Sequence, residues 1–151
     1  MSLEQDIKQA KFRNEHHKAS INIIYTYNWV MERQKALFDA ENITPQQFNI
    51  LRILRGSAPR PISTLQIRER MLDRMSDTSR IVDRLVLKGL AGKKTCTSDK
   101  RLVDISITDT GLKLLQRLDA KNAEMDATLG ALSEDEVKTL NILLDKIRKP
   151  D

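Results

Sequence analysis

The sequence predicts a mainly α-helical protein with one small β-hairpin. Three segments carry a Gln or Glu three residues after Thr44, Ser63 and Ser133, and this capping-box pattern marks the start of a helix. Between Val103 and Ile107 the apolar residues change to strict alternation, which is typical of a half-buried strand. The 151 residues, 40% hydrophobic and 31% charged, are enough for one globular domain with its own core.

The N-terminal segment predicts one long helix, because residues 3–39 contain neither Pro nor Gly. From Ile21 to Met31 apolar side chains lie on every side of this helix. A helix of that kind is buried on several sides, and a monomer of this size has little material with which to cover its N-terminus. We therefore expect a partner chain against this segment.

Three helices are expected between residues 44 and 89. The first begins after Thr44 and ends near Gly56, and the second begins after Ser63. The third has Ser76 as its expected N-cap and ends at Gly89, a residue type favoured just after a helix. The short join between the second and third helices, with a polar outer face on the third, is typical of a helix-turn-helix.

The strand over 103–107 is expected to pair with Lys93–Thr95, and this hairpin would make the helix-turn-helix a winged one. Beyond it, Thr108 begins a helix whose apolar side extends to Leu129, and Ser133 begins the last one. The last helix carries a heptad-like seam that could pack internally or against a second copy. We divide the chain into an N-terminal dimerisation helix (1–42), a winged helix-turn-helix lobe (43–108) and C-terminal dimerisation helices (109–151).

Positive charge is concentrated in the middle of the chain. Residues 44–108 contain 13 Lys and Arg against 6 Asp and Glu, a net charge of +7, whereas the remaining residues carry −2. A local basic field attracts phosphate, and an α-helix beside a basic hairpin fits a DNA duplex. The alternative is a solvated basic face without a partner.

The composition argues against several other classes of function. No apolar run is long enough to span a membrane, and the start of the chain lacks the apolar core of a secretory signal. The single cysteine, Cys96, excludes an internal disulfide framework and suits the cytoplasm. No nucleophile–base pair, phosphate-binding glycine loop or metal-ligand spacing is present, so we expect neither an enzyme nor a cofactor nor a metal.

In order and residue type, these elements resemble the MarR (multiple antibiotic resistance regulator) family of winged-helix transcription factors. Four segments carry the resemblance: ITPQQFNILRIL from residue 43, SxxSRIVDRLxxKGL from residue 76, SDKRxVxISITxxG from residue 98 and LSEDEVxxLxxLL from residue 132. The resemblance implies an obligate homodimer with intertwined terminal helices. It also implies a sequence-specific DNA-binding regulator, a repressor in the simplest case, that binds a palindromic operator and is modulated by a small ligand.

The candidate site residues follow from the residue pattern and the resemblance together. Ser79 and Arg80 are the candidates for base edges, and Asp83 is expected to orient Arg80 or Arg84. Arg74 is an expected phosphate contact, and the resemblance places Arg101 in the minor groove with Asp99 steadying it. The expected recognition-helix contacts are Ser76, Thr78, Ser79, Arg80 and Arg84. The expected wing contacts are Lys93, Lys94, Asp99, Lys100 and Arg101. The expected dimer-interface residues are Ile21, Ile24, Val137, Leu140, Leu144 and Ile147.

Two further hypotheses concern regulation. Tyr25, Tyr27 and Trp29 could line a pocket for a small aromatic or lipophilic effector, or simply pack in a core or an interface. Cys96 could make the protein redox-responsive, although a bystander cysteine without a role is the simpler explanation. A winged helix that contacts another protein instead of DNA is the alternative function.

Overall fold

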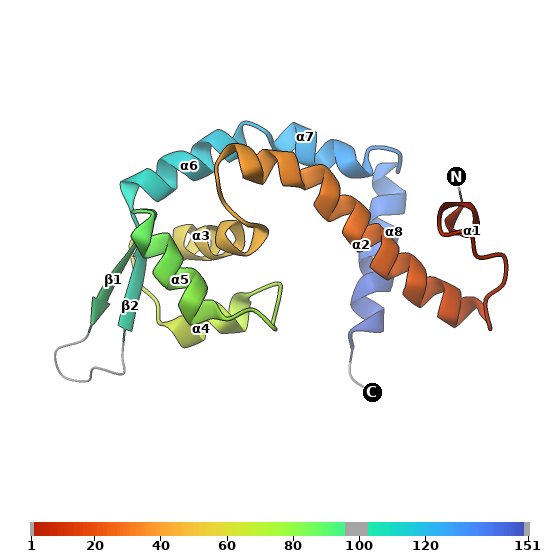
Figure 1. Ribbon diagram of the computed structural model, residues 1–151, viewed down its shortest axis with the longest axis horizontal. Coiled ribbons are helices and arrows are strands. Elements are labelled where there is room, and N and C mark those ends of the chain that lie inside the picture. Colours follow the sequence, from red (N-terminus) through yellow and green to blue (C-terminus); the bar gives the residue numbers. More distant parts are fainter. Residues whose placement is uncertain (1, 96–102, 150–151) are drawn as a thin grey trace. The chain divides into compact units, whose positions relative to one another are not determined.

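The computed structural model describes residues 2–95 and 103–149, which form helices and one antiparallel hairpin (Figure 1). The chain falls into two compact units, Met1–Ala36 and Leu37–Asp151. No helix within the described ranges is long and apolar enough to cross a membrane. The predicted fold class, mainly α-helical with a winged helix-turn-helix, is confirmed.

The first unit holds α1 (Leu3–Asp6) and most of α2 (Glu15–Ala40). The prediction of a single helix over residues 3–39 is therefore wrong. Lys8 adopts a φ of 53°, which no right-handed helix contains, and the side-chain oxygen of Asn14 accepts a hydrogen bond from the His17 amide at 2.9 Å. Asn14 thus satisfies one of the free amides in the first turn of α2, a start signal within an otherwise helical pattern.

The winged lobe contains α3 (Pro45–Ser57), α4 (Thr64–Arg70), α5 (Thr78–Leu87), β1 (Ala91–Thr95) and β2 (Val103–Ile107). Complete capping boxes precede α3 and α4, as predicted. The two strands pair antiparallel, with Lys93 opposite Ile105. Ile62, just before α4, forms an additional bridge to Ile105 from the other side. The hairpin is therefore fastened to the helical part of the lobe through its central residue.

The core of the lobe lies where α3, α4, α5, β2 and α6 (Asp109–Asp119) meet. Ile50, Leu51 and Leu54 of α3 are buried, whereas Phe48 and Ile53 lie partly buried at the edge. Ile105 is fully buried and contacts this cluster from the sheet. The largest fully buried side chains are Ile50, Leu51, Leu54, Ile67, Val82, Leu85, Ile105, Leu115 and Leu118.

The end of α5 is joined to β1 and α6 by a compact junction. Gly89 adopts a φ of 71°, and the amides of Gly89 and Leu90 each donate to α5 carbonyls at 2.9 Å, which is a Schellman C-cap. The Thr108 hydroxyl donates to the Gly89 carbonyl at 2.7 Å and also caps α6. Gly111 packs directly on this junction, since a Cβ there would overlap the Leu90 carbonyl oxygen and lie 2.8 Å from Ile107 Cγ1.

Two ion pairs fasten α6 to the rest of its unit. Arg55 of α3 contacts Asp119 at 2.6 Å, and Arg117 contacts Glu41, in the turn before α3, at 2.6 Å. The hydrogen bond from Arg117 lowers the pKa of Glu41, and the hydrogen bond from Arg55 lowers the pKa of Asp119. Both acids therefore stay ionised to a lower pH than unpaired carboxylates do.

The C-terminal part contains α7 (Asn122–Asp126), a 3₁₀ turn (Ala127–Leu129) and α8 (Glu134–Ile147). The capping box at Ser133 is confirmed. The helix expected to reach Leu129 instead ends at Asp119, and no Pro or Gly near that position signals the break. No residue of α8 is buried, and Ile142, Leu143 and Ile147 are exposed.

Replacing Gly111 by Ala is expected to lower the free energy of unfolding by about 1–3 kcal/mol, because the new methyl group overlaps the backbone of Leu90. Urea unfolding followed by circular dichroism measures the change. Gly56→Ala is the matched control: no atom lies within 4 Å of its added Cβ, so the helix-favouring substitution should stabilise by up to about 1 kcal/mol. Equal stability of the Gly111→Ala variant and the wild type would contradict the proposed close contact.

Candidate nucleic-acid interface

The start of α5 differs by one residue from the prediction. Asp77, not Ser76, is the N-cap, and its carboxylate accepts a hydrogen bond from the Arg80 amide at 3.2 Å. An acid at this position also interacts favourably with the helix dipole. The side chain of Arg80 also lies close to Asp77. Its guanidinium Nε is 3.7 Å from the other oxygen of the Asp77 carboxylate. The helix start and the orientation of Arg80 are thus set by the same side chain.

The outward face of α5 carries the polar side chains expected there, with one exception. Ser79, Arg80 and Arg84 are exposed, and Ser76 is half-buried just before the helix. Thr78 is only 4% exposed and lies on the core side of the helix, one turn before Val82. Its hydroxyl has no hydrogen-bond partner among the described residues. A buried side chain cannot reach a duplex, so Thr78 is removed from the candidate contacts.

The acids near this face pair differently from the prediction. Asp83 was expected to orient Arg80 or Arg84, but its carboxylate contacts Lys93 of β1 at 2.8 Å. Asp77 is the acid that holds Arg80. The Asp83–Lys93 pair links the recognition helix to the first strand of the wing, and both side chains remain substantially exposed. Each acid therefore compensates one cation of the basic face when no polyanion is present.

Other cations of this lobe have no acidic partner among the described residues. Arg84 lies on the exposed face of α5 and Lys94 on β1, and neither forms an ion pair there. Lys93 and Lys94 are neighbours in an extended strand, so they point to opposite faces of the hairpin. Arg68 and Arg74, in and after α4, are also exposed. Exposed cations therefore lie on the helix-turn-helix and on both faces of the hairpin, and Lys93 is the one directed toward α5.

Several candidate residues lie outside the described part of the chain. The wing residues Asp99, Lys100 and Arg101, together with Cys96, fall within 96–102. Their roles stay predictions.

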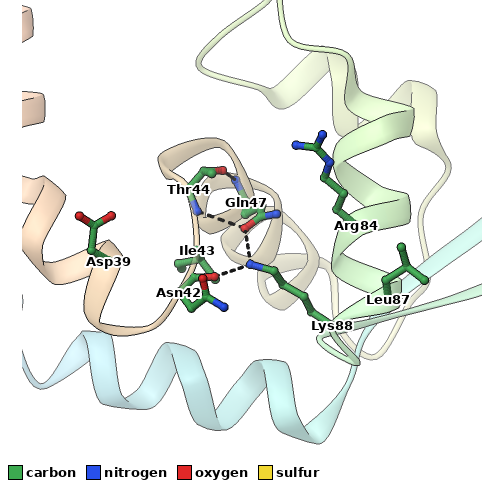
Figure 2. Close-up of a pocket in the computed structure, with 8 residues that line it drawn as sticks. All are labelled: Asp39, Asn42, Ile43, Thr44, Gln47, Arg84, Leu87 and Lys88. Carbon is green, nitrogen blue, oxygen red and sulfur yellow. Dashed lines mark hydrogen bonds between the residues drawn. The ribbon is translucent and has the colours of Figure 1, made fainter.

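The effector-pocket role suggested for Tyr25, Tyr27 and Trp29 of α2 stays a prediction. Tyr25 is 37% and Tyr27 59% exposed, while Trp29 is half-buried with the Arg33 guanidinium 4.1 Å from its ring centre. That contact is a cation–π interaction. A pocket lined by other residues lies within the second unit, and we name it the α3–α5 pocket (Figure 2). It is lined by Asp39, Asn42, Ile43, Thr44, Gln47, Arg84, Leu87 and Lys88.

Sequence reasoning did not find this pocket, because it joins residues about forty positions apart that share no motif. The one available signal was Lys88, a cation in the last turn before Gly89, whose partners only the fold reveals. Its ammonium donates to the Asn42 carbonyl and, at 3.3 Å, to Gln47 Oε1.

The residues expected at a dimer interface differ in exposure. Ile24 is 62% and Ile147 66% exposed, whereas Ile21, Val137, Leu140 and Leu144 are half-buried. Both α2 and α8 therefore present apolar side chains to solvent in the single chain. Large exposed apolar surfaces are typical of protein–protein contacts.

Comparison with known proteins places the chain among transcriptional regulators. The model of the MarR family matches residues 43–103. The HTH-type transcriptional regulator PecS of Dickeya dadantii is 30% identical over 115 residues, which cover 75% of this chain and 69% of PecS. A MarR transcription factor from Planctomyces limnophilus is 31% identical, with a TM-score of 0.69 over 89% of this chain and 98% of that one. A MarR mutant from E. coli complexed with operator DNA has the same fold, with a TM-score of 0.80 at 23% identity over 93% of this chain and all of that one.

Replacing Asp77 by Ala is expected to cost about 0.5–2 kcal/mol of the free energy of unfolding, because the Arg80 amide loses its capping acceptor. Thermal and urea unfolding measure the loss. Ser76→Ala is the control at the neighbouring position, and it removes no capping bond, so its stability should stay close to that of the wild type. A larger loss for Ser76→Ala than for Asp77→Ala would restore the original assignment.

Proposed function

The chain belongs to the MarR family of transcriptional regulators, and on that premise we propose that it binds a palindromic operator as a homodimer and represses transcription. The observation that carries this proposal is the exposed face of α5, where Ser79, Arg80 and Arg84 stand free of the core beside the basic strand β1. An α-helix with such a face fits the major groove. A protein that occupies promoter DNA excludes the polymerase, so repression is the simplest outcome.

We assign different tasks to the exposed cations. Arg80 and Ser79 are the candidates for base edges, since Arg can form two hydrogen bonds to guanine and a hydroxyl can bond several bases. Lys94 and Arg74 are candidates for phosphate, which gives affinity and salt dependence without sequence preference. Arg84 could take either task. The family resemblance adds Arg101, steadied by Asp99, as a minor-groove contact, with Lys100 beside it.

The proposed dimer explains the apolar side chains that the single chain leaves exposed. We propose that α2, through residues such as Ile21 and Ile24, and α8, through its seam from Val137 to Ile147, meet the same surfaces of a second copy. A two-fold dimer presents its two recognition helices about 34–36 Å apart, one turn of B-DNA. The proposal also places the protein in the cytoplasm, where bacterial DNA lies, and assigns it no catalytic activity, in keeping with regulators of this family.

Substitution of Arg80 and of Lys94 by Ala is expected to give two distinct signatures in fluorescence anisotropy with the upstream promoter DNA. Arg80→Ala should reduce the preference over scrambled duplex, with a cost of about 1–3 kcal/mol at the site. Lys94→Ala should weaken binding to both duplexes equally and reduce the salt slope by about one. Loss of promoter preference in the Lys94→Ala variant alone would reverse the assignment.

Lys93→Ala is the matched control for Lys94, because the two lysines are adjacent in β1. Lys93 already pairs with the Asp83 carboxylate. A DNA phosphate that binds Lys93 would therefore only take the place of that carboxylate. Its removal should therefore change the salt slope less than the removal of Lys94. Wild-type protein that shows no binding at low salt would contradict the proposed function itself.

Replacing Ile24 by Glu is expected to convert the dimer to a monomer in sedimentation velocity, because a charge enters an apolar interface. Leu65→Glu is the matched control: Leu65 on α4 is 63% exposed and Ile24 is 62% exposed, but Leu65 lies outside the proposed interface. It should sediment as the wild type does. A wild-type protein that sediments as a single subunit across the micromolar range would refute the dimer.

A further inference from the structure

The turn between α4 and α5, residues 71–77, carries the two most exposed large apolar side chains of the residues that the structure describes. Met75 is 94% exposed and Leu72 is 88% exposed. Single apolar residues on a surface are ordinary, but these two lie within four positions of one turn. Apolar side chains that gather on a surface in this way are typical of a contact site.

The backbone of this turn is well ordered. Met71, its first residue, is buried in the core of the lobe. The Leu72 amide donates to the side-chain oxygen of Asn49 on α3 at 2.9 Å. The Met75 amide donates to the Asp73 carboxylate at 3.0 Å. The two exposed side chains therefore project from a fixed backbone, and little ordering of the chain is needed when a partner covers them.

Met75 lies at the end of the recognition helix that is remote from the hairpin. It precedes Asp77, the N-cap of α5, by two residues, whereas β1 follows the other end of the helix (Figure 1). In a helix-turn-helix, the first residues of the second helix contact the base edges in the major groove. On the proposed function, on which this inference rests, Met75 therefore enters the groove with the end of α5 that bears Ser79 and Arg80.

The surroundings of the two apolar side chains favour DNA as the partner. Arg74 stands between them in the sequence, and Arg68 near the end of α4 is also exposed. The acids of the turn are engaged in its own structure, since Asp73 binds the Met75 amide and Asp77 caps α5. Apolar groups with arginines next to them match the major groove, where phosphates border the base edges and thymine presents a methyl group.

We propose that Met75 contacts the C5-methyl group of a thymine in each half-site, and that Leu72 adds to the apolar surface that this methyl group meets. An unbranched thioether side chain adapts readily to the exact position of a methyl group. The contact selects thymine over cytosine without a hydrogen bond, because cytosine has no C5-methyl group and presents an amino group instead. It adds an apolar contact to the hydrogen bonds proposed for Ser79 and Arg80.

The test compares two forms of the upstream promoter duplex, one with thymine and one with deoxyuridine at every thymine position. Deoxyuridine pairs with adenine as thymine does, but it lacks the C5-methyl group in the major groove. Fluorescence anisotropy with the full chain gives the dissociation constant for each duplex. The wild type should bind the thymine duplex about tenfold more tightly, because each copy in the dimer gains a methyl contact equivalent to roughly a factor of three to four.

Met75→Ala removes the proposed contact, so the ratio of the two dissociation constants should fall about threefold or more. Comparison of this ratio between wild type and variant cancels the methyl contacts of other residues and the effect of uracil on duplex shape. Met75→Leu keeps an apolar side chain of similar volume and should hold the ratio within about twofold of the wild-type value. Because Met75 is exposed, both variants should fold as the wild type does.

Leu65→Ala is the matched control, since Leu65 is also a large exposed apolar side chain of the helix-turn-helix and lies on α4. The first helix of a helix-turn-helix crosses the DNA backbone, so its side chains do not reach methyl groups in the groove. The ratio of dissociation constants in this variant should equal that of the wild type. An equal fall of the ratio in Leu65→Ala and Met75→Ala would contradict the assignment to Met75.

Two other results would overturn the inference and leave the proposed function intact. The first is equal affinity of the wild type for both duplexes. The second is an unchanged ratio in Met75→Ala, which would leave the apolar turn to a protein partner. A wild-type protein that binds neither duplex at low salt would instead refute the proposed function, and the thymine contact with it.

Discussion

The winged lobe depends on the close approach of Gly111 to the carbonyl of Leu90. This contact joins three elements at one point, because Leu90 follows the C-cap of α5, begins the chain into β1 and accepts a hydrogen bond from the Thr108 amide at the start of α6. The left-handed conformation of Gly89 turns the chain out of the helix just before it. Two glycines therefore fix the angles at which the recognition helix and the wing leave a common base.

The electrostatics of the lobe show how a basic surface is kept stable without its polyanion. The cap residue Asp77 compensates Arg80, and Asp83 compensates Lys93 across the gap between α5 and β1. Neither pair is buried, so each contributes little to stability by itself. Their effect is to hold Arg80 and Lys93 in defined positions. Asp77 and Asp83 thus fix the positions of Arg80 and Lys93, and the lobe as a whole keeps its positive charge.

Much of this fold could be predicted from local signals, because each is written within a few residues. The capping boxes at Thr44, Ser63 and Ser133 and the alternation of β2 all gave correct helix starts and a correct strand. The errors arose where two local signals compete. Ser76 and Asp77 are both good N-caps, and only the geometry of the turn selects Asp77. Asn14 begins α2 within a segment whose composition alone favoured one continuous helix. Thr78 is polar by type but buried by its place on the helix. The α3–α5 pocket and the Asp83–Lys93 pair each join residues of different secondary-structure elements. A pattern within one element therefore could not predict them.

The short connection between α5 and β1 has a consequence for the choice of binding site. Only residues 88–90 separate the helix from the strand, and the capping bonds and the Asp83–Lys93 pair restrain that connection further. The lobe has little freedom to bend within itself. An extra base pair between two half-sites turns one of them by about 34–36° around the duplex axis, a mismatch that follows from 10–10.5 base pairs per turn. In the proposed dimer, any tolerance for such spacing must come from residues outside the lobe, so the way in which the two copies join would set the register of the operator.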